Sequence, residues 1–180
     1  MKTIINSEHN KNTVISCHNI KKTYGKSDAR VFALRNIDLD VFENELLMLV
    51  GPSGCGKTTF VSIISAMLKA DSGECLVLGK ELNKLSTEEK NYFRSYSIGF
   101  VFQSFNLLPA LTALENVAVP LLIQGVKRTT AIKEAKTMLN TVGLGSRIHA
   151  LSGELSGGEK QRVAIARALI HKPKFGLPPF

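Results

Sequence analysis

Residues 46–58 constrain the fold of this 180-residue chain more than any other segment. Five consecutive apolar residues at 46–50 run directly into Gly-Pro-Ser-Gly-Cys-Gly-Lys-Thr at 51–58. An unbroken apolar run of this length is typical of a strand that is buried on both faces of a parallel sheet. Apolar residues at helical spacing between 58 and 68 predict a helix after the loop. A buried strand, a glycine-rich turn and a helix in this order predict an α/β fold.

The glycine-rich turn has the pattern G-x-x-x-x-G-K-[ST] of a phosphate-binding loop. Its glycines let successive backbone N–H groups turn towards phosphate oxygens. Lys57 is expected to hold the β- and γ-phosphates, and the Thr58 hydroxyl to ligate Mg²⁺. A glycine-rich turn that happens to contain a lysine is the alternative, which the flanking strand and helix disfavour. The candidate nucleotide-binding residues are Gly51, Ser53, Gly54, Cys55, Gly56, Lys57, Thr58 and Thr59.

Short strands are predicted mainly in the first half of the chain. Apolar residues at 14–15 and 31–34, followed by apolar residues that alternate with polar ones over 37–41, indicate short half-buried strands. Short apolar runs predict further strands at 75–78 and 98–102. We expect sheet-forming residues first, a helical segment second and a sheet strand again at the end.

Helices are predicted in the second half. The first opens at a capping box formed by Thr112 and Glu115, and Pro120 is expected to kink or end it. The second covers 132–142, and Gly143 follows it in the position usual for a helix C-terminus.

A third helix opens at residues 155–159, Leu-Ser-Gly-Gly-Glu. Ser156 and Glu159 form another capping box, and Pro173 is expected to stop the helix. Ser156 and the two glycines after it expose backbone N–H donors at the positive end of a helix dipole, which predicts a second anion-binding site. Taken alone, the segment is also compatible with an ordinary capped helix.

The two glycine-rich segments, about a hundred residues apart, together resemble the phosphate-binding loop and the signature of ATP-binding cassette (ABC) ATPases. That signature usually has Gln at the position of Glu159. The resemblance extends over about residues 14–174. It implies that the signature contacts ATP through Leu155, Ser156, Gly157, Gly158 and Glu159.

Two further residues match positions that this family uses. Gln103, directly after the predicted strand at 98–102, matches the Q-loop glutamine, which contacts Mg²⁺ or the attacking water. The resemblance therefore implies that Gln103 and Lys57 are catalytic residues, and that Gln103 and Thr58 hold the metal. Tyr24 matches an aromatic residue that stacks on adenine. A polar strand end and a surface tyrosine are the alternatives for these two residues.

The segments 102–109 and 111–117 look most like an exporter subgroup that includes lipoprotein-releasing, macrolide-efflux and antimicrobial-peptide-resistance systems. The family has a P-loop NTPase (RecA-like) core with an antiparallel β subdomain and a helical subdomain. The resemblance implies one nucleotide-binding domain divided at about 1–103 (β subdomain and core), 104–158 (helical subdomain) and 159–180 (signature helix and Walker B segment).

ATP and Mg²⁺ are the cofactors that the resemblance implies. Two subunits of the family sandwich two ATP molecules, each held between one phosphate loop and the signature of the other subunit. The implied partners are therefore a second copy and separate integral membrane permease chains. The sequence has no apolar run near the ~20 residues of a membrane helix and no signal peptide at its start. We expect a location on the cytoplasmic face of the inner (plasma) membrane, reached through the permease.

The resemblance fails in the last six residues. The Walker B pattern of the family places its Asp at Pro179 and its catalytic Glu at Phe180, so neither acid is present. No histidine of the chain matches the family's downstream histidine. We expect the core sheet to lack its C-terminal strands, and the Walker B strand to be missing beside residues 46–50. A non-functional remnant of a broken gene is therefore one alternative.

The formal net charge of +8 lies mostly in residues 121–180. A basic block also suits a soluble cassette that acts on nucleic acid or ribosomes. Such cassettes occur in tandem or carry long coiled-coil insertions, and no heptad run lies between Gln103 and Ser156. Nucleic acid is therefore the less favoured partner. The three cysteines, Cys17, Cys55 and Cys75, lack metal-ligand or redox spacing and are expected to be free thiols.

We expect this chain alone to bind ATP poorly, to hydrolyse it negligibly and to aggregate readily. The missing acids include the group that activates water, and general acid–base catalysis contributes about 10²–10⁴-fold. Phosphate release by the purified chain in ATP and Mg²⁺ measures this turnover. Magnesium-dependent turnover that Lys57→Ala abolishes would contradict the expectation.

Overall fold

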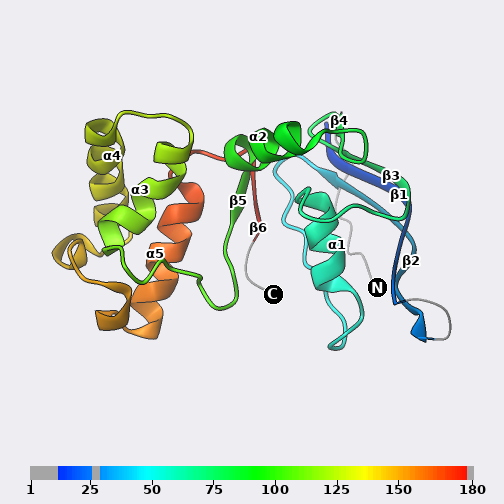
Figure 1. Cartoon of the computed structure of the whole chain (residues 1–180), viewed down its shortest axis with the longest axis horizontal. Helices are drawn as coiled ribbons and strands as arrows, with labels where there is room; N and C mark the ends of the chain where they lie inside the picture. The colour runs from blue at the N-terminus through cyan, green and yellow to red at the C-terminus, as the bar shows by residue number, and fades with distance from the viewer. Residues whose placement is uncertain (1–11, 26–28, 178–180) are drawn as a thin grey trace. The chain divides into compact units, whose positions relative to one another are not determined.

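The computed structural model describes residues 12–25 and 29–177 (Figure 1). The chain divides into two compact units, residues 1–90 and residues 91–180. Pro179 and Phe180, where the family pattern would place two acids, lie outside the described residues. Within these described residues, no helix is long and apolar enough to cross a membrane.

The first unit is built on a four-stranded sheet with the order β2-β1-β3-β4. Its strands are β1 (Thr13–Tyr24), β2 (Val31–Phe42), β3 (Ser72–Val77) and β4 (Lys80–Glu81). All neighbouring strands run antiparallel. β1 is an inner strand, because it pairs with β2 on one side and with β3 on the other.

β1 and β2 are each 12 residues long, which exceeds the short strands predicted for this region. Asn19 and Asn36 both have a φ of 51°, and the register of β1 on β2 shifts between Cys17 and Ile20. Asparagine adopts left-handed φ values more readily than most residues. The strands therefore continue through these irregularities, and the two predicted strands between 31 and 41 are one strand.

α1 (Lys57–Ile64) follows the glycine-rich loop and ends four residues earlier than predicted. Ala66 has a φ of 57°, and its N–H donates to the Ile63 carbonyl at 2.9 Å. The Met67 N–H donates to the Ser62 carbonyl at 2.9 Å. These two bonds form a Schellman-type helix end, so backbone hydrogen bonding closes α1 although the apolar spacing continues.

Residues 46–50 do not form the predicted buried strand. Leu46, Met48 and Val50 are 86%, 71% and 54% exposed. Among the described residues, no strand pairs with this segment. A strand buried on both faces needs neighbouring strands and covering layers, whereas the strands of the first unit pair only with one another. The prediction was wrong because the apolar run does not itself supply those neighbours.

The second unit combines helices with one pair of parallel strands. The strands are β5 (Ile98–Phe100) and β6 (Phe175–Leu177). β5 confirms the strand predicted from residue 98, although it is shorter. β6 lies in the segment where the Walker B strand was expected, but it pairs with β5 and not with residues 46–50. The helices are α2 (Thr87–Ser97, beginning in the first unit), α3 (Ala113–Ile123), α4 (Arg128–Thr141) and α5 (Gly157–Leu169), with short 3₁₀ helices η2 (Gly145–Arg147) and η3 (Ser152–Glu154).

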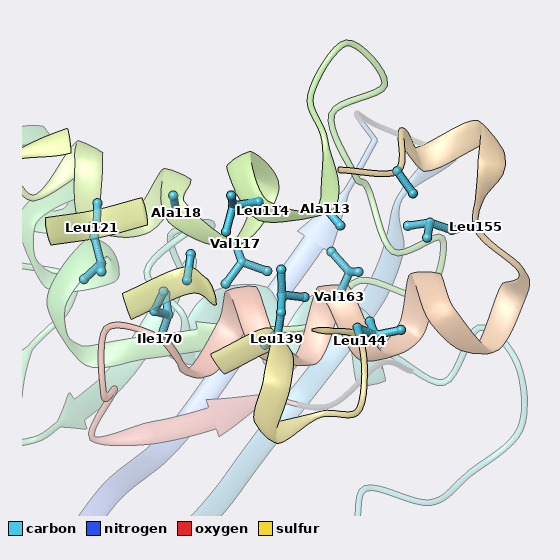
Figure 2. Packing of buried hydrophobic residues seen from close by; sticks show 14 residues of the cluster. Ala113, Leu114, Val117, Ala118, Leu121, Leu139, Leu144, Leu155, Val163 and Ile170 are labelled. Atoms are coloured by element: carbon cyan, nitrogen blue, oxygen red, sulfur yellow. The ribbon is translucent and has the colours of Figure 1, made fainter. Parts of the chain in front are cut away.

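α3, α4 and α5 enclose the main hydrophobic core of the second unit (Figure 2). Val117, Leu139 and Val163 contribute one fully buried side chain from each helix. Leu144 and Leu155, from the connecting segments, pack into the same cluster. Leu155 thereby fixes the start of α5 to the core of its own unit.

The predicted start of α3 and the predicted end of α4 are confirmed. The Thr112 hydroxyl accepts from the Glu115 N–H at 3.2 Å, and the Glu115 carboxylate accepts from the Thr112 N–H at 3.1 Å. Gly143, with a φ of 73°, follows Val142, the C-cap of α4. Pro120 does not end α3, which continues to Ile123. Proline has no N–H to donate, so one hydrogen bond of the helix is missing at this point. Packing of α3 against α4 and α5 stabilises the helix in spite of this loss.

Asn116 is a fully buried polar residue on α3. Its Oδ1 accepts from the Leu108 N–H at 2.8 Å. Its Nδ2 donates to the carbonyls of Leu108 and Leu111 at 3.1 Å and of Thr112 at 3.0 Å. One side chain therefore holds the segment that leads from β5 into α3.

Asn116→Ala is expected to lower the free energy of unfolding by about 1–3 kcal/mol, because the Leu108 N–H loses its acceptor and three part-buried carbonyls each lose a donor. Urea denaturation followed by circular dichroism measures this change. Asn140→Ala, an exposed change on α4, is the matched control and should alter stability by no more than about 0.5 kcal/mol. Equal effects of the two substitutions would show that the Asn116 network is not stabilising.

Candidate functional site

The glycine-rich loop forms a tight turn before α1. The Cys55 N–H donates to the Pro52 carbonyl at 3.3 Å, and Gly54 and Gly56 have φ values of 78° and 93°. α1 begins at Lys57. A Cβ added at Gly54 would meet no atom within 4 Å, so the backbone here faces open space.

Gly56 lies directly against the backbone of β2. A Cβ at this position would be 2.3 Å from the Ala33 carbonyl oxygen and 2.9 Å from the Leu34 side chain. Glycine is required here for two reasons, the left-handed φ and the close approach of the two backbones. This contact positions the first turn of α1 on the sheet.

Lys57 folds back onto its own loop. Its Nζ donates to the carbonyls of Gly51 at 2.7 Å and of Pro52 at 2.9 Å, and lies 3.5 Å from the Cys55 Sγ. The ammonium group therefore lies over the loop interior. There it can exchange the two carbonyls for phosphate oxygens as hydrogen-bond acceptors. Thr58 is exposed, and the structure gives its hydroxyl no hydrogen bond among the described residues.

A cavity of about 350 Å³ adjoins the loop. Residues between 50 and 57 line one side, and residues between 32 and 37 of β2 line the other. Backbone donors, the Lys57 ammonium and the dipole of α1 converge on the loop and match the chemistry of a polyphosphate. The residues present therefore fit a nucleotide phosphate chain.

Tyr24 lies at the end of β1 in the same unit, with 45% of its surface exposed. It is not among the described residues that line the cavity. The preceding residues are held by Asp71, which accepts from the Lys22 Nζ at 2.6 Å and from the Thr23 N–H at 2.7 Å. These two hydrogen bonds lower the pKa of Asp71. The tyrosine is therefore an exposed ring on an anchored strand end.

Gln103 lies in the second unit, in a turn shortly after β5. Its side chain is exposed. The turn continues through Phe105 and Asn106, which have φ values of 60° and 45°. Two consecutive non-glycine residues in the left-handed region are strained and need support from their surroundings.

That support comes from Arg167 on α5, a residue that sequence reasoning did not identify as part of the site. Its guanidinium donates to the Phe105 carbonyl at 2.6 Å and to the Asn106 carbonyl at 2.7 Å. Phe105 also packs against the apolar cluster of Val101 and Ala164. The only sequence signal was a basic residue near the end of the signature helix, which does not say what it binds. Arg167 thus ties the turn after Gln103 to α5.

The 155–159 segment forms the start of α5 as predicted. Ser156 is the N-cap; its hydroxyl accepts from the Glu159 N–H at 3.3 Å. The Glu159 carboxylate accepts from the Ser156 N–H at 2.7 Å. A Cβ at Gly157 would meet nothing within 4 Å. The helix start is therefore capped and still open at Gly157, a geometry that suits an anion.

Glu159 places a negative charge beside this helix start. The hydrogen bonds from Ser156 lower its pKa, and the nearby guanidinium groups of Arg147 and Arg162 act in the same direction. Arg147 Nε lies 3.3 Å from the carboxylate. The arginines offset the charge of Glu159, so the capping box does not leave a bare carboxylate at the helix N-terminus.

Each unit therefore carries one helix start whose backbone faces open space. The first unit holds the loop, Lys57, Thr58 and Tyr24, and the second holds Gln103 and the 155–159 segment. Among the described residues, no group of three or more His, Cys, Asp or Glu side chains could hold a metal ion. A metal at Thr58 or Gln103 would thus depend on ligands from the phosphates and water.

Comparison with known proteins gives consistent matches. A family model described as "ABC transporter" matches residues 34–177. The chain is 47% identical over 158 residues to the lipoprotein-releasing system ATP-binding protein LolD of Shewanella oneidensis, covering 88% of this chain and 69% of that protein. It is 43% identical over 161 residues to an uncharacterized ABC transporter ATP-binding protein of Methanocaldococcus jannaschii, covering 89% and 72%.

A solved structure also matches. A dimeric post-hydrolysis state of the ATP-binding cassette MJ0796, bound to ADP and Pi, gives a TM-score of 0.84 at 38% identity. The match covers 91% of this chain and 72% of that chain.

Gly56→Ala is expected to destabilise the first unit more than Gly54→Ala. Both substitutions put a side chain at positive φ, which costs about 1–2 kcal/mol, but only the Gly56 variant also forces a methyl group into the β2 backbone. Urea denaturation of the two variants measures the difference. Equal losses would mean that the loop does not rest on β2 as described.

Proposed function

The chain belongs to the ABC transporter family as an ATP-binding ATPase subunit, and we propose that its two helix starts bind opposite sides of ATP in a pair of subunits. The loop at 51–58 of one copy would hold the phosphates, and the 155–159 segment of a second copy would cover the γ-phosphate. The observation that carries this proposal is the open backbone at both Gly54 and Gly157. Each opening lies at a helix N-terminus, where backbone N–H groups and the helix dipole favour an anion, and each leaves space for a second surface.

Lys57 and the loop N–H groups are the residues that hold the phosphates in this proposal. The Lys57 ammonium exchanges the Gly51 and Pro52 carbonyls for phosphate oxygens. Gly51, Ser53, Gly54, Cys55, Gly56 and Thr59 complete the cradle through their backbones and side chains. These groups bind and orient the phosphate chain.

We propose that the Thr58 hydroxyl is a ligand of Mg²⁺ and that Gln103 contacts the Mg²⁺ or the attacking water. When bound, Mg²⁺ neutralises charge on the phosphate oxygens. Both side chains are exposed and offer oxygen atoms, the ligand type that Mg²⁺ prefers. Arg167 then acts as a positioning residue, because it holds the turn that carries Gln103.

Tyr24 is proposed to stack on adenine. Its exposed ring lies at the end of β1, and Asp71 holds the residue before it by accepting a hydrogen bond from the Thr23 N–H. A flat aromatic face suits a purine, and such contacts contribute about 0.5–1.5 kcal/mol beyond the area they bury.

The assembly proposed is a pair of copies docked on separate integral membrane permease chains at the cytoplasmic face of the inner membrane. The domain division at about 1–103, 104–158 and 159–180 belongs to the same proposal. The similarity to LolD supports an exporter of the subgroup that contains lipoprotein-releasing systems. No observation favours the alternative of a cassette that acts on nucleic acid or ribosomes.

Titration of the full chain with a fluorescent ATP analogue in Mg²⁺ tests the nucleotide site. Lys57→Ala is expected to weaken binding at least tenfold relative to the parent chain, because it removes the charge facing the phosphates. Lys69→Ala, an exposed lysine in the same unit, is the matched control and should stay within twofold. Unchanged binding by the Lys57 variant would refute the assignment of the loop.

Under conditions in which two copies of the parent chain associate in ATP and Mg²⁺, Ser156→Arg is expected to prevent that association and to leave ATP binding within twofold, because the segment acts on a second copy. Sedimentation velocity with and without Mg²⁺ and ATP measures association. Ser146→Arg, at an exposed serine of η2, is the control for added charge and should associate like the parent chain. Association of the Ser156 variant at the parent level would exclude the proposed sandwich.

A further inference from the structure

Cys17 and Cys75 form a buried pair of thiols that the nucleotide site does not use. Cys17 lies on β1 and Cys75 on β3, directly opposite each other in the antiparallel ladder. Both side chains are fully buried, and their sulfur atoms are 3.2 Å apart. All three cysteines are free, but only this pair combines burial with contact.

The backbone at this pair already meets the geometric requirement of a disulfide. Residues directly opposite in an antiparallel pair have Cα atoms about 4.5–5.5 Å apart, and disulfides bridge Cα atoms about 4.4–6.8 Å apart. The sulfur atoms need only close from 3.2 Å to about 2.05 Å. No strand has to move to a new register.

The same surroundings keep the pair reduced while the sheet is closed. The contact with the Cys75 thiol, together with burial, raises the pKa of Cys17 far above its ordinary value. The thiolate is the species that attacks a disulfide, and an oxidant cannot reach a sulfur atom with no exposed surface. Reaction therefore requires β1 and β3 to separate locally, or takes place before they pair.

We propose that Cys17 and Cys75 are a disulfide modification site, oxidised by low-molecular-weight disulfides. A thiolate of the pair attacks the small disulfide and releases one thiolate of it; the second cysteine then attacks the mixed disulfide and releases the other. Two protein thiols and one small disulfide yield one protein disulfide and two small thiols. Each cysteine sulfur loses one electron to the small disulfide.

The bond would enclose most of the first unit in a covalent loop. Cys17 and Cys75 are 58 positions apart, and the loop between them contains β2, the 51–58 segment and α1. Cross-linking residues this far apart restricts the unfolded chain strongly. Neither cysteine is among the described residues lining the cavity beside the 51–58 segment, so the bond would form outside the nucleotide site.

Incubation of the full chain in buffers with increasing ratios of oxidised to reduced glutathione tests the proposal. A low urea concentration that stays below the unfolding transition allows local opening, and sampling continues until the products no longer change. Alkylation, proteolysis and mass spectrometry then locate the bonds. The expected product links the peptides of residues 17 and 75 with the loss of two hydrogens, and dithiothreitol reverses it. The linked protein is expected to melt at least about 5 °C higher than the reduced protein.

Cys55→Ser and Cys75→Ala are the two variants for this experiment. Cys55→Ser removes the exposed thiol and should form the same link as the parent chain. Cys75→Ala should form no link, and its melting temperature should not respond to the redox buffer. The proposal is overturned if the pair remains two free thiols at ratios that convert Cys55 to its glutathione adduct. It is also overturned if Cys17 or Cys75 stops at a stable glutathione adduct, or if the linked protein melts at or below the reduced one.

Discussion

The contact between Gly56 and the Ala33 carbonyl is the constraint on which the first unit depends. Backbone meets backbone at this point, with no room for a side chain between them. α1 starts at the next residue, and Phe60, one turn later, is buried against the unit. β2 is an edge strand that pairs with β1. The close approach of Gly56 to β2 therefore sets the position of the glycine-rich loop relative to the sheet.

Polar side chains play the corresponding part in the second unit. Arg167 holds the carbonyls of Phe105 and Asn106, and Asn116 holds the backbone from Leu108 onwards. Between them they fix an irregular segment that has no strand or helix of its own between β5 and α3. The arginine stands on α5, so the turn containing Gln103 and the helix that begins at the signature segment form one hydrogen-bonded body.

Short-range signals in the sequence predicted the features that depend on neighbouring residues. Each of these features depends only on residues a few positions apart in the chain. They are the capping boxes at Thr112 and Ser156, the glycine after α4 and the turn of the 51–58 loop. The prediction of a strand at 46–50 was wrong, because a buried strand requires partner strands from elsewhere in the chain. Arg167 was missed for the same reason, since its acceptors lie about 60 positions away. Pro120 does not end α3, because packing of the helix outweighs one lost hydrogen bond.

The folded-back position of Lys57 changes how its contribution to affinity should be understood. Its ammonium already donates to two carbonyls, so an incoming phosphate replaces these partners and does not meet a bare cation. The net gain is the difference between two sets of hydrogen bonds, which is smaller than the attraction of an isolated charge pair. In return, the lysine holds the loop in a receptive shape before any ligand arrives, which reduces the conformational entropy lost on binding. A loop of this kind discriminates by charge. Only an anion that attracts the Lys57 ammonium more strongly than two peptide carbonyls do can replace them as its hydrogen-bond acceptor.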